Sequence, residues 1–276
     1  MLSLHTNTAG LTIRTNLAAN NSALSTSMTR LGTGYKINSA ADDAAGLQIA
    51  TRLLAQTRGM SVASQNTQNG ISLMQTAEGA FQEFTNIVLR MKDLATQAAD
   101  GATTDDDRTA LAAEFTELTA ELGNILDNTT YGGESLFATG GKLAAAVEFQ
   151  IGATGAEKME VDITTELGDV TTFQGTPGAL TDATTSTDAI TTLSDALDSI
   201  GAARAKLGAA QNRLTHTFNN LQNMQTNTTD ARGRIMDIDY AAETANMTSK
   251  NILMQAGTSM LKQSSQMSQM VLSLLQ

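Results

Sequence analysis

Cysteine is absent from this chain of 276 residues, which excludes disulfides, zinc–thiolate sites and cysteine nucleophiles. Tryptophan is also absent, proline occurs only at Pro177, and aromatic residues make up 4% of the chain. The hydrophobic residues, 41% in all, must therefore be mostly Met, Leu, Ala and Ile, which suit narrow contacts between helices. Because a single proline leaves long helices uninterrupted, the composition predicts a mostly helical protein.

Positive charge is scarce: the chain has 17 Lys and Arg but 28 Asp and Glu, which gives a net charge of −11. A nucleic-acid partner requires basic patches, so the charge argues against one. No stretch approaches the roughly 18 consecutive apolar residues of a membrane-spanning helix. The opening MLSLHTNTAGLTIR has no basic segment followed by an apolar core, so we expect any export to use a route without signal cleavage.

Residues that carry chemistry are few and scattered. The two histidines, His5 and His216, are too few for a His-rich metal site, and we expect His216 to be a polar residue on a helix surface. Asp237 and Asp239 do not continue into a calcium-binding loop, so a capping role is expected. Gly32–Lys36 lacks the spacing of a phosphate-binding loop and is predicted to be a flexible joint. We therefore predict no enzymatic activity, no metal and no cofactor.

Apolar residues recur at alternating steps of three and four, or every seven, over three segments. This spacing predicts three long amphipathic helices that pack side by side as an antiparallel, coiled-coil-like rod. The residues of the three stripes are Met74, Ala77, Phe81, Phe84, Val88, Met91, Ala95 and Ala98; Leu111, Phe115, Leu118, Leu122 and Ile125; and Leu193, Ile200, Leu207, Leu214 and Leu221.

Two helix starts carry capping signals. Ser39 followed by Asp42 resembles a capping box before the first long helix. Thr104, followed by three aspartates, supplies an N-cap and negative charge in the first turn of the next helix. The first long helix, from about Asp42 to Ala99, would be roughly 85 Å long, which favours a fibrous subunit over a compact enzyme.

The segment 138–187 has a different pattern. Val147–Ile151 and Met159–Ile163 alternate apolar and polar residues around two glycines, which predicts a β-hairpin. The Thr- and Gly-rich stretch that follows is predicted to be a surface loop. We expect residues 168–185 to be dispensable for any assembly.

The two chain ends form a pair of apolar stripes. Thr248–Gln276 carries no charge beyond Lys250 and Lys262, which is unusual for a surface helix, so we expect it to face other subunits. The predicted subunit-interface residues are Ile13, Leu17, Leu24, Met28 and Leu31 near the start, and Ile252, Ala256, Met260, Met267, Met270 and Leu274 near the end.

An energy comparison predicts that these ends do not fold as an isolated pair. About twenty apolar side chains at about 2 kcal/mol each contribute roughly 40 kcal/mol on full burial. Ordering about eighty residues costs on the order of 100 kcal/mol. The termini therefore require neighbouring molecules to become stably ordered.

Two segments carry a family resemblance. Leu31–Ala50, LGTGYKINSAADDAAGLQIA, closely resembles the signature that joins the terminal and rod domains of bacterial flagellins. AKLGAAQNRLTHTFNNLQN and RIMDIDYAAETANMTSKNILMQAGTSML resemble the C-terminal signature of the same family. The likeness covers about residues 1–137 and 188–276, and the MLSLHTN opening resembles some lateral flagellins.

The resemblance implies a domain plan without outer domains. The terminal segments form an inner helical domain, D0, whose helices pair in the assembled filament, and the adjoining helices form the rod domain D1. The implied ranges are 1–41 and 233–276 for D0, 42–137 for the N-terminal D1 helices, 138–187 for the hairpin and loop, and 188–232 for the C-terminal D1 helix.

The implied function is that of a secreted structural subunit that polymerises into the extracellular flagellar filament for swimming or swarming. Implied partners are further copies of the chain, an export chaperone of the flagellar type III apparatus that covers Ala245–Leu275, and the filament cap and hook-associated proteins. A hook–filament junction protein shares the terminal architecture but matches these signatures less well. A signalling coiled coil is also rich in heptads, but usually has membrane spans.

A further implied partner is the flagellin-sensing Toll-like receptor of animals. LRMKDLA, which begins at Leu89, resembles the receptor-binding stretch of the family, and Glu114 matches its acidic partner. Helical spacing predicts that Arg90 and Leu94 share one exposed stripe. A contact between subunits would use the same stripe, so assembly alone is the alternative interpretation.

Overall fold

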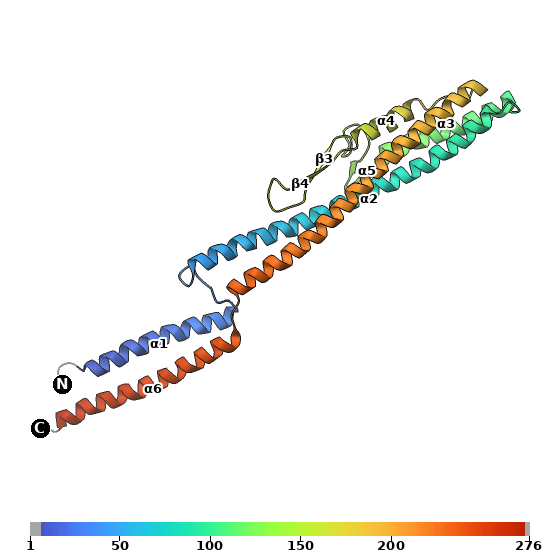
Figure 1. Ribbon diagram of the computed structural model, residues 1–276. Coiled ribbons are helices and arrows are strands. Elements are labelled where there is room, and N and C mark those ends of the chain that lie inside the picture. Colours follow the sequence, from blue (N-terminus) through green and yellow to red (C-terminus); the bar gives the residue numbers. More distant parts are fainter. Residues whose placement is uncertain (1–6, 274–276) are drawn as a thin grey trace. The chain divides into compact units, whose positions relative to one another are not determined.

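The computed structural model describes residues 7–273 of the chain. Its helices are α1 (Thr8–Thr33), α2 (Ala44–Ala99), α3 (Asp105–Asn128), α4 (Thr164–Gly175), α5 (Ala183–Met236) and α6 (Tyr240–Ser273) (Figure 1). The strands are β1 (Thr130–Tyr131), β2 (Glu134–Ser135), β3 (Val147–Gln150) and β4 (Lys158–Val161). The predicted mostly helical fold with a β-hairpin is confirmed.

The chain divides into two compact units. The rod unit is Gln56–Thr226, and the terminal unit combines Met1–Ala55 with Asn227–Gln276. The long helices α2 and α5 each contribute a segment to both units. The D0 and D1 boundaries that the resemblance implies, 41/42 and 232/233, remain a prediction.

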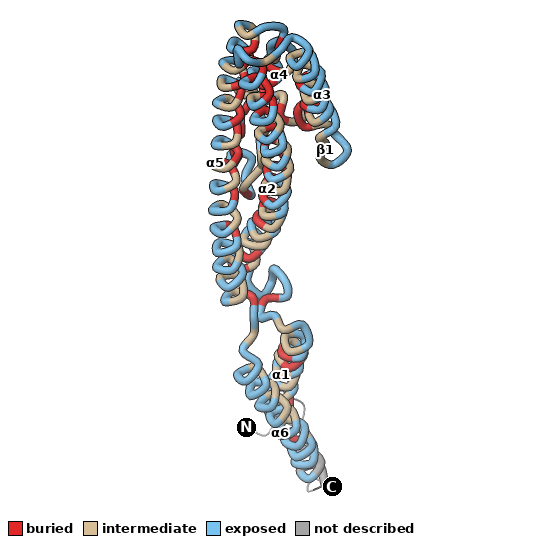
Figure 2. The backbone as a smooth tube through the Cα atoms, turned by 90° about the vertical axis from the view of Figure 1, so that its right-hand side faces the viewer, coloured by how far each residue is buried: buried red, intermediate tan, exposed pale blue. Residues whose placement is uncertain are grey.

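The rod unit has one continuous hydrophobic core. It joins α2, α3, α4 and α5 to the segments that follow α3, and the buried positions run along the rod-unit parts of α2 and α5 (Figure 2). Phe81 and Phe84 are fully buried, and the ring of Phe137 meets Phe81 edge-on at a centroid distance of 5.0 Å. The predicted periodic residues of α2 and α5 are buried, whereas Leu111, Leu118 and Ile125 of α3 are partly buried at the core's edge.

The predicted N-cap of α3 is confirmed. The Thr104 hydroxyl accepts a hydrogen bond from the Asp107 N–H, and the Asp107 carboxylate accepts from the Thr104 N–H, which completes a capping box. The box predicted for α2 is wrong in part. Asp42 accepts from the Ser39 N–H, but the helix begins two residues later, where Asp43 accepts from the Gly46 N–H at 2.8 Å.

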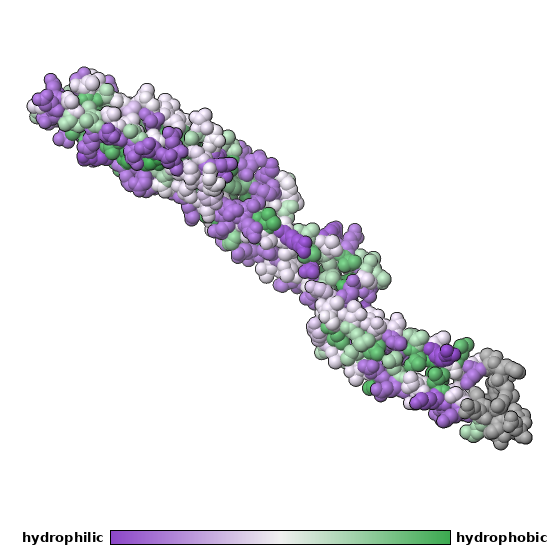
Figure 3. Space-filling model, turned by 180° about the vertical axis from the view of Figure 1, so that it is seen from behind, coloured by the Kyte–Doolittle hydropathy of each residue, from purple (hydrophilic) through white to green (hydrophobic). Residues whose placement is uncertain are grey.

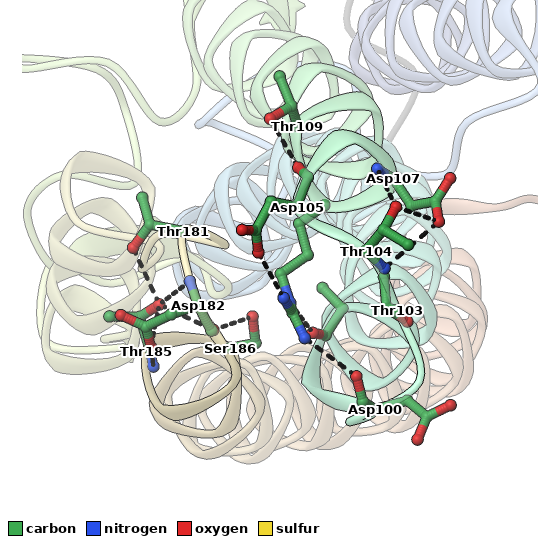
Figure 4. Close-up of polar contacts among 12 residues, drawn as sticks. Asp100, Thr103, Thr104, Asp105, Asp107, Thr109, Thr181, Asp182, Thr185 and Ser186 are labelled. Atoms are coloured by element: carbon green, nitrogen blue, oxygen red, sulfur yellow. Dashed lines mark hydrogen bonds and ion pairs between the residues drawn. The ribbon is translucent and has the colours of Figure 1, made fainter.

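Arg108 closes the turn between α2 and α3. Figure 4 shows this turn with the labelled residues Asp100, Thr104 and Asp105. Its Nε donates to the Ala98 carbonyl at 2.9 Å, and Nη2 donates to the Asp100 carbonyl at 3.1 Å. Nη1 lies 2.9 Å from the Asp105 carboxylate, and the side chain is only 12% exposed. The guanidinium therefore supplies a donor to the Ala98 carbonyl in the last turn of α2 and a second donor to the Asp100 carbonyl, which also accepts from the Thr103 N–H.

The predicted hairpin is confirmed as β3 and β4, which pair antiparallel with Val147 opposite Val161. The hairpin lies close against α2 because two residues of that helix are glycine. A Cβ added at Gly59 would approach the Ala153 Cβ to 2.7 Å, and one at Gly70 would approach the Phe149 ring to 3.0 Å. Any larger residue at Gly59 would push the hairpin away.

The surface-loop prediction for the following stretch is wrong in part, because only residues 176–182, between α4 and α5, lie outside helices and strands. Residues 164–175 form α4, whose Leu167, Val170 and Phe173 are buried in the core, and Leu180 is buried beyond its end. The spacing of these three residues places them on one side of a short helix. Residues 168–185 therefore contribute Val170, Phe173 and Leu180 to the core of the rod unit.

The predicted joint at Gly32–Lys36 is a hydrogen-bonded turn. Gly34 ends α1 with φ +76°, and the backbone then pairs with the segment before α6. The Lys36 N–H donates to the Met236 carbonyl at 2.6 Å, and the Ile238 N–H donates to the Gly34 carbonyl at 3.1 Å. Asp239 has the expected capping role, because its carboxylate accepts from the N–H groups of the first turn of α6.

Candidate subunit interface

In the terminal unit, α1 and α6 lie side by side within one chain (Figure 1). Leu24 and Ser27 of α1 are buried, Ser264 of α6 is buried, and the Asn7 amide donates to the Ser264 hydroxyl at 3.0 Å. A groove between the two helices is lined by residues that include Ile13, Leu17, Leu253, Ala256 and Met260. Part of the predicted interface therefore serves contact within the chain.

The contact between α1 and α6 is thin. Leu24 is the one large apolar side chain that α1 and α6 bury among the residues whose burial the structure describes. Ile13, Leu17 and Leu31 are half-buried. A seam with so little apolar burial gives little stability against the entropy of ordering two long helices.

The other predicted residues lie on the surface. Side-chain exposure is 53% at Met28, 60% at Ile252, 58% at Met260, 53% at Met267 and 60% at Met270. Sequence reasoning did not include Leu11 and Leu253, which are also exposed, although both occur within the same amphipathic segments. Leu274 lies outside the described residues. In Figure 3 hydrophobic side chains gather on the part of the surface that the terminal helices form.

The exposed apolar residues of α6 between Ile252 and Met270 form one stripe. At 100° per residue they fall within an arc of about 100°, next to the seam residues Gly257 and Ser264. We call these residues, Ile252, Leu253, Ala256, Met260, Met267 and Met270, the outer stripe. A shallow groove lined by Tyr240, Thr244, Thr248 and Ile252, among others, extends the apolar surface toward the start of α6. Contiguous apolar surface of this kind is typical of an interaction site.

The rod unit presents a charged surface pair at the predicted receptor-recognition residues. Arg90 Nε of α2 donates to the Glu114 carboxylate of α3 at 2.8 Å, and the two side chains are 53% and 45% exposed. Leu89 is 47% exposed beside them. The exposed position predicted for Leu94 is wrong. Leu94 is 1% exposed, because the core on this side of α2 is wider than a single heptad seam.

Other charged groups hold the rod unit together. Arg204 of α5 contacts Glu78 of α2 at 2.9 Å and donates to the Gln82 side chain at 2.6 Å. Lys206 of α5 lies 2.7 Å from Glu166 of α4, and this hydrogen bond lowers the pKa of Glu166 below its ordinary value. These ion pairs therefore connect α5 to α2 and to α4 within the rod unit.

Within residues 7–273, none of the helices combines the length and hydrophobicity that a membrane crossing requires. The same part of the chain holds no group of three or more His, Cys, Asp or Glu side chains arranged to bind a metal ion. Long paired helices with an apolar terminal stripe define a helical structural protein.

Comparison with known proteins identifies the family. The chain matches the family described as bacterial flagellin N-terminal helical region over residues 4–141, and that described as bacterial flagellin C-terminal helical region over residues 190–275. The chain therefore belongs to the bacterial flagellins.

Individual relatives agree with this assignment. The chain is 38% identical to a flagellin of Halalkalibacterium halodurans, over 90% of each chain. It is 47% identical to the B-type flagellin of Pseudomonas aeruginosa over 162 residues, which are 59% of this chain but only 33% of that protein. The crystal structure of Bacillus cereus flagellin superposes with a TM-score of 0.51 at 33% identity, and the match covers 57% of this chain and 88% of that one.

Proposed function

We propose that this chain is the secreted structural subunit of a bacterial flagellar filament and that the outer stripe of α6 binds neighbouring copies. The observation that carries the proposal is the row of exposed apolar residues from Ile252 to Met270, of which Ile252, Met260, Met267 and Met270 are more than half exposed. Exposure of these side chains to water is unfavourable, and a helix with so few charges has little to keep it apart from identical neighbours. Self-association buries the stripe.

The thin seam supports coupling between folding and assembly. Leu24 is the one large apolar side chain that the described residues of α1 and α6 bury. Neighbouring copies supply the missing contacts, so α1 and α6 become stably ordered when the subunit enters the filament.

Polymerisation of the purified chain tests this proposal. Ile252→Asp combined with Met267→Asp should raise the critical concentration for assembly at least about tenfold, since charge burial in the stripe is unfavourable. The matched control, Thr258→Asp with Ser265→Asp, adds the same charge at exposed positions opposite the stripe.

Electron microscopy should show long filaments of the wild type and of the control. Filaments formed equally well by both double variants would contradict the role of the stripe. A wild-type chain that forms no filaments on its own would favour a junction protein over a filament subunit.

The outer stripe also suits an export chaperone. Before assembly, the apolar residues of 245–275 are prone to non-specific association, so a chaperone that covers them keeps the subunit soluble during type III secretion. Removal of Ile252–Gln276 should abolish chaperone binding. If the truncated chain bound the chaperone with unchanged affinity in a titration, this role of the stripe would be contradicted. The filament cap and hook-associated proteins are further partners that the proposed function requires at the filament ends.

The exposed group of Leu89, Arg90 and Glu114 suits recognition by the flagellin-sensing Toll-like receptor. Arginine is frequent at interface centres, where its loss commonly costs more than about 1 kcal/mol. Arg90→Asp should weaken activation of receptor-bearing reporter cells by monomer, whereas Arg213→Asp, the same charge change on the exposed surface of α5, should not. Equal responses to both variants would leave assembly as the sole role of this surface.

A further inference from the structure

Methionine supplies all the sulfur of this protein. The chain has 13 methionines and no cysteine, so any oxidation at sulfur must occur at a thioether. Five of the methionines lie in α6 alone, at positions 247, 254, 260, 267 and 270. A large part of the oxidisable sulfur is therefore concentrated in one helix.

The methionines of the outer stripe differ sharply in exposure from those of the rod core, whereas Met224 of the rod unit is 37% exposed and Met236 of the terminal unit only 8%. In the outer stripe, Met260, Met267 and Met270 are 58%, 53% and 60% exposed. In the rod unit, the side chains of Met60, Met74, Met91 and Met159 are 0–2% exposed. Since susceptibility of sulfur to oxidants follows its exposure, the stripe should react well before the rod core.

We propose that Met260, Met267 and Met270 form a modification site at which hydroperoxides reversibly control self-association of the subunit. A lone pair of the thioether sulfur attacks the outer peroxide oxygen, the O–O bond breaks, and an S–O bond forms. The sulfur loses two electrons, and the peroxide is reduced to an alcohol, or to water in the case of hydrogen peroxide. The products balance as one sulfoxide and one alcohol or water molecule.

The sulfoxide changes the stripe from apolar to polar. Methionine is a flexible apolar side chain that adapts to irregular contacts, and its sulfoxide disrupts methionine-rich interfaces. Burial of three sulfoxides at a subunit contact requires partners for their oxygens, which an apolar surface does not supply. The buried seam residues Leu24 and Ser264 carry no sulfur. Met260 also lines the groove between α1 and α6, so its sulfoxide would weaken the contact within the chain as well as the contact between copies.

This inference rests on the proposed function, because it assigns oxidation its effect through the contact between copies. It adds that the stripe is accessible to peroxide in the free subunit and protected in the filament. It also adds that reductases specific for methionine sulfoxide restore assembly.

The test is partial oxidation of monomer with hydrogen peroxide, followed by polymerisation and separation of filaments from unassembled chains. Peptide mass spectrometry should find sulfoxide at Met260, Met267 and Met270 enriched at least about tenfold in the unassembled fraction. This enrichment is expected if oxidation lowers the affinity between copies by an order of magnitude. Treatment of that fraction with methionine sulfoxide reductases should return it to filaments. Far-UV circular dichroism should show the rod unit still folded.

A variant with Met260→Leu, Met267→Leu and Met270→Leu keeps the stripe apolar and should polymerise after peroxide treatment that stops the wild type. Equal sulfoxide content at these positions in both fractions would overturn the proposal, as would peroxide inhibition of the leucine variant equal to that of the wild type. Failure of untreated wild type to polymerise would instead contradict the proposed function. If the leucine variant does not assemble, the distribution of sulfoxide in wild type decides.

Discussion

The rod unit and the terminal unit are built from the same kind of amphipathic helix, yet they bury very different amounts of it. In the rod unit the stripes of α2 and α5 meet each other, α3, α4 and the hairpin, so Phe81, Met91 and Leu193 are fully buried. In the terminal unit α1 and α6 pack mainly against each other, and Ile252 and Met270 remain 60% exposed. Helical periodicity predicts that a face is apolar, and the number of neighbours decides whether it is covered.

The largest expected difference between the two units is in the free energy of unfolding that the same Leu→Ala substitution removes from each. Leu193→Ala removes a fully buried side chain from the rod core and should lower the free energy of unfolding by about 2–5 kcal/mol. Leu24→Ala, in the terminal seam, should leave the free energy of unfolding of the monomer, measured by urea titration, within about 0.5 kcal/mol of wild type. Equal losses in urea titrations of the two monomeric variants would show that both units fold as one.

A smaller loss in the free energy of unfolding is expected from changing Arg108 at the turn between α2 and α3. Arg108→Met keeps the length of the side chain but removes the side-chain donor of the Ala98 carbonyl and one of the two donors of the Asp100 carbonyl, which still accepts from the Thr103 N–H. The free energy of unfolding should fall by about 1–3 kcal/mol. Arg90→Met, which breaks an exposed pair with Glu114, should cost no more than about 1 kcal/mol. A larger loss from Arg90 than from Arg108 in thermal melts would contradict this ranking.

The smallest expected effect depends on pH. Hydrogen bonds from the Thr104 hydroxyl and N–H lower the pKa of Asp107 below its ordinary value of 3.8. Because the folded-state pKa is the lower one, the contribution to stability is full above the unfolded pKa and is lost as pH falls through the folded pKa. Asp107→Asn should therefore be less stable than wild type at pH 6, and the difference should shrink below pH about 4. Urea midpoints that differ by the same amount across this range would exclude the linkage.

Much of the rod unit could be predicted from the sequence because its signals are long. The stripe from Met74 to Ala98 predicted the long helix α2, and the capping signal at Asp42 placed its start to within two residues. Alternation at Val147 and Met159 located the hairpin. Long repeats are reliable because many positions must agree. The start of α5 at Ala183, before the first heptad leucine, follows from Asp182, whose carboxylate accepts from the Thr185 N–H.

Short elements were missed although signals for them exist. Leu167, Val170 and Phe173 lie on one side of α4, but three apolar residues at helical spacing among threonines and glycines are weak evidence for a helix. Gly132 and Gly133, both with positive φ, form the tight turn between β1 and β2, and a Gly-Gly pair is a known hairpin signal.

The candidate interface could be predicted only in part. Periodicity identified the apolar residues of both termini, but it could not divide them between the α1–α6 seam and the outer stripe. That division depends on which helix lies alongside, as Leu24 and Met28 show on neighbouring turns of α1. The burial of Leu94 has the same origin, since the core around α2 has several neighbours and so a wide buried arc.

Amide hydrogen exchange of the monomer and the filament tests most directly the claim that the rod unit folds alone and the terminal unit folds on assembly. In monomer, amides of α1 and α6 should exchange at least about 100-fold faster than those of α2 between Met74 and Ala98, because exchange follows local stability. In filament this difference should largely disappear, while protection of the rod unit changes little. Terminal helices as protected in dilute monomer as in filament would contradict the account.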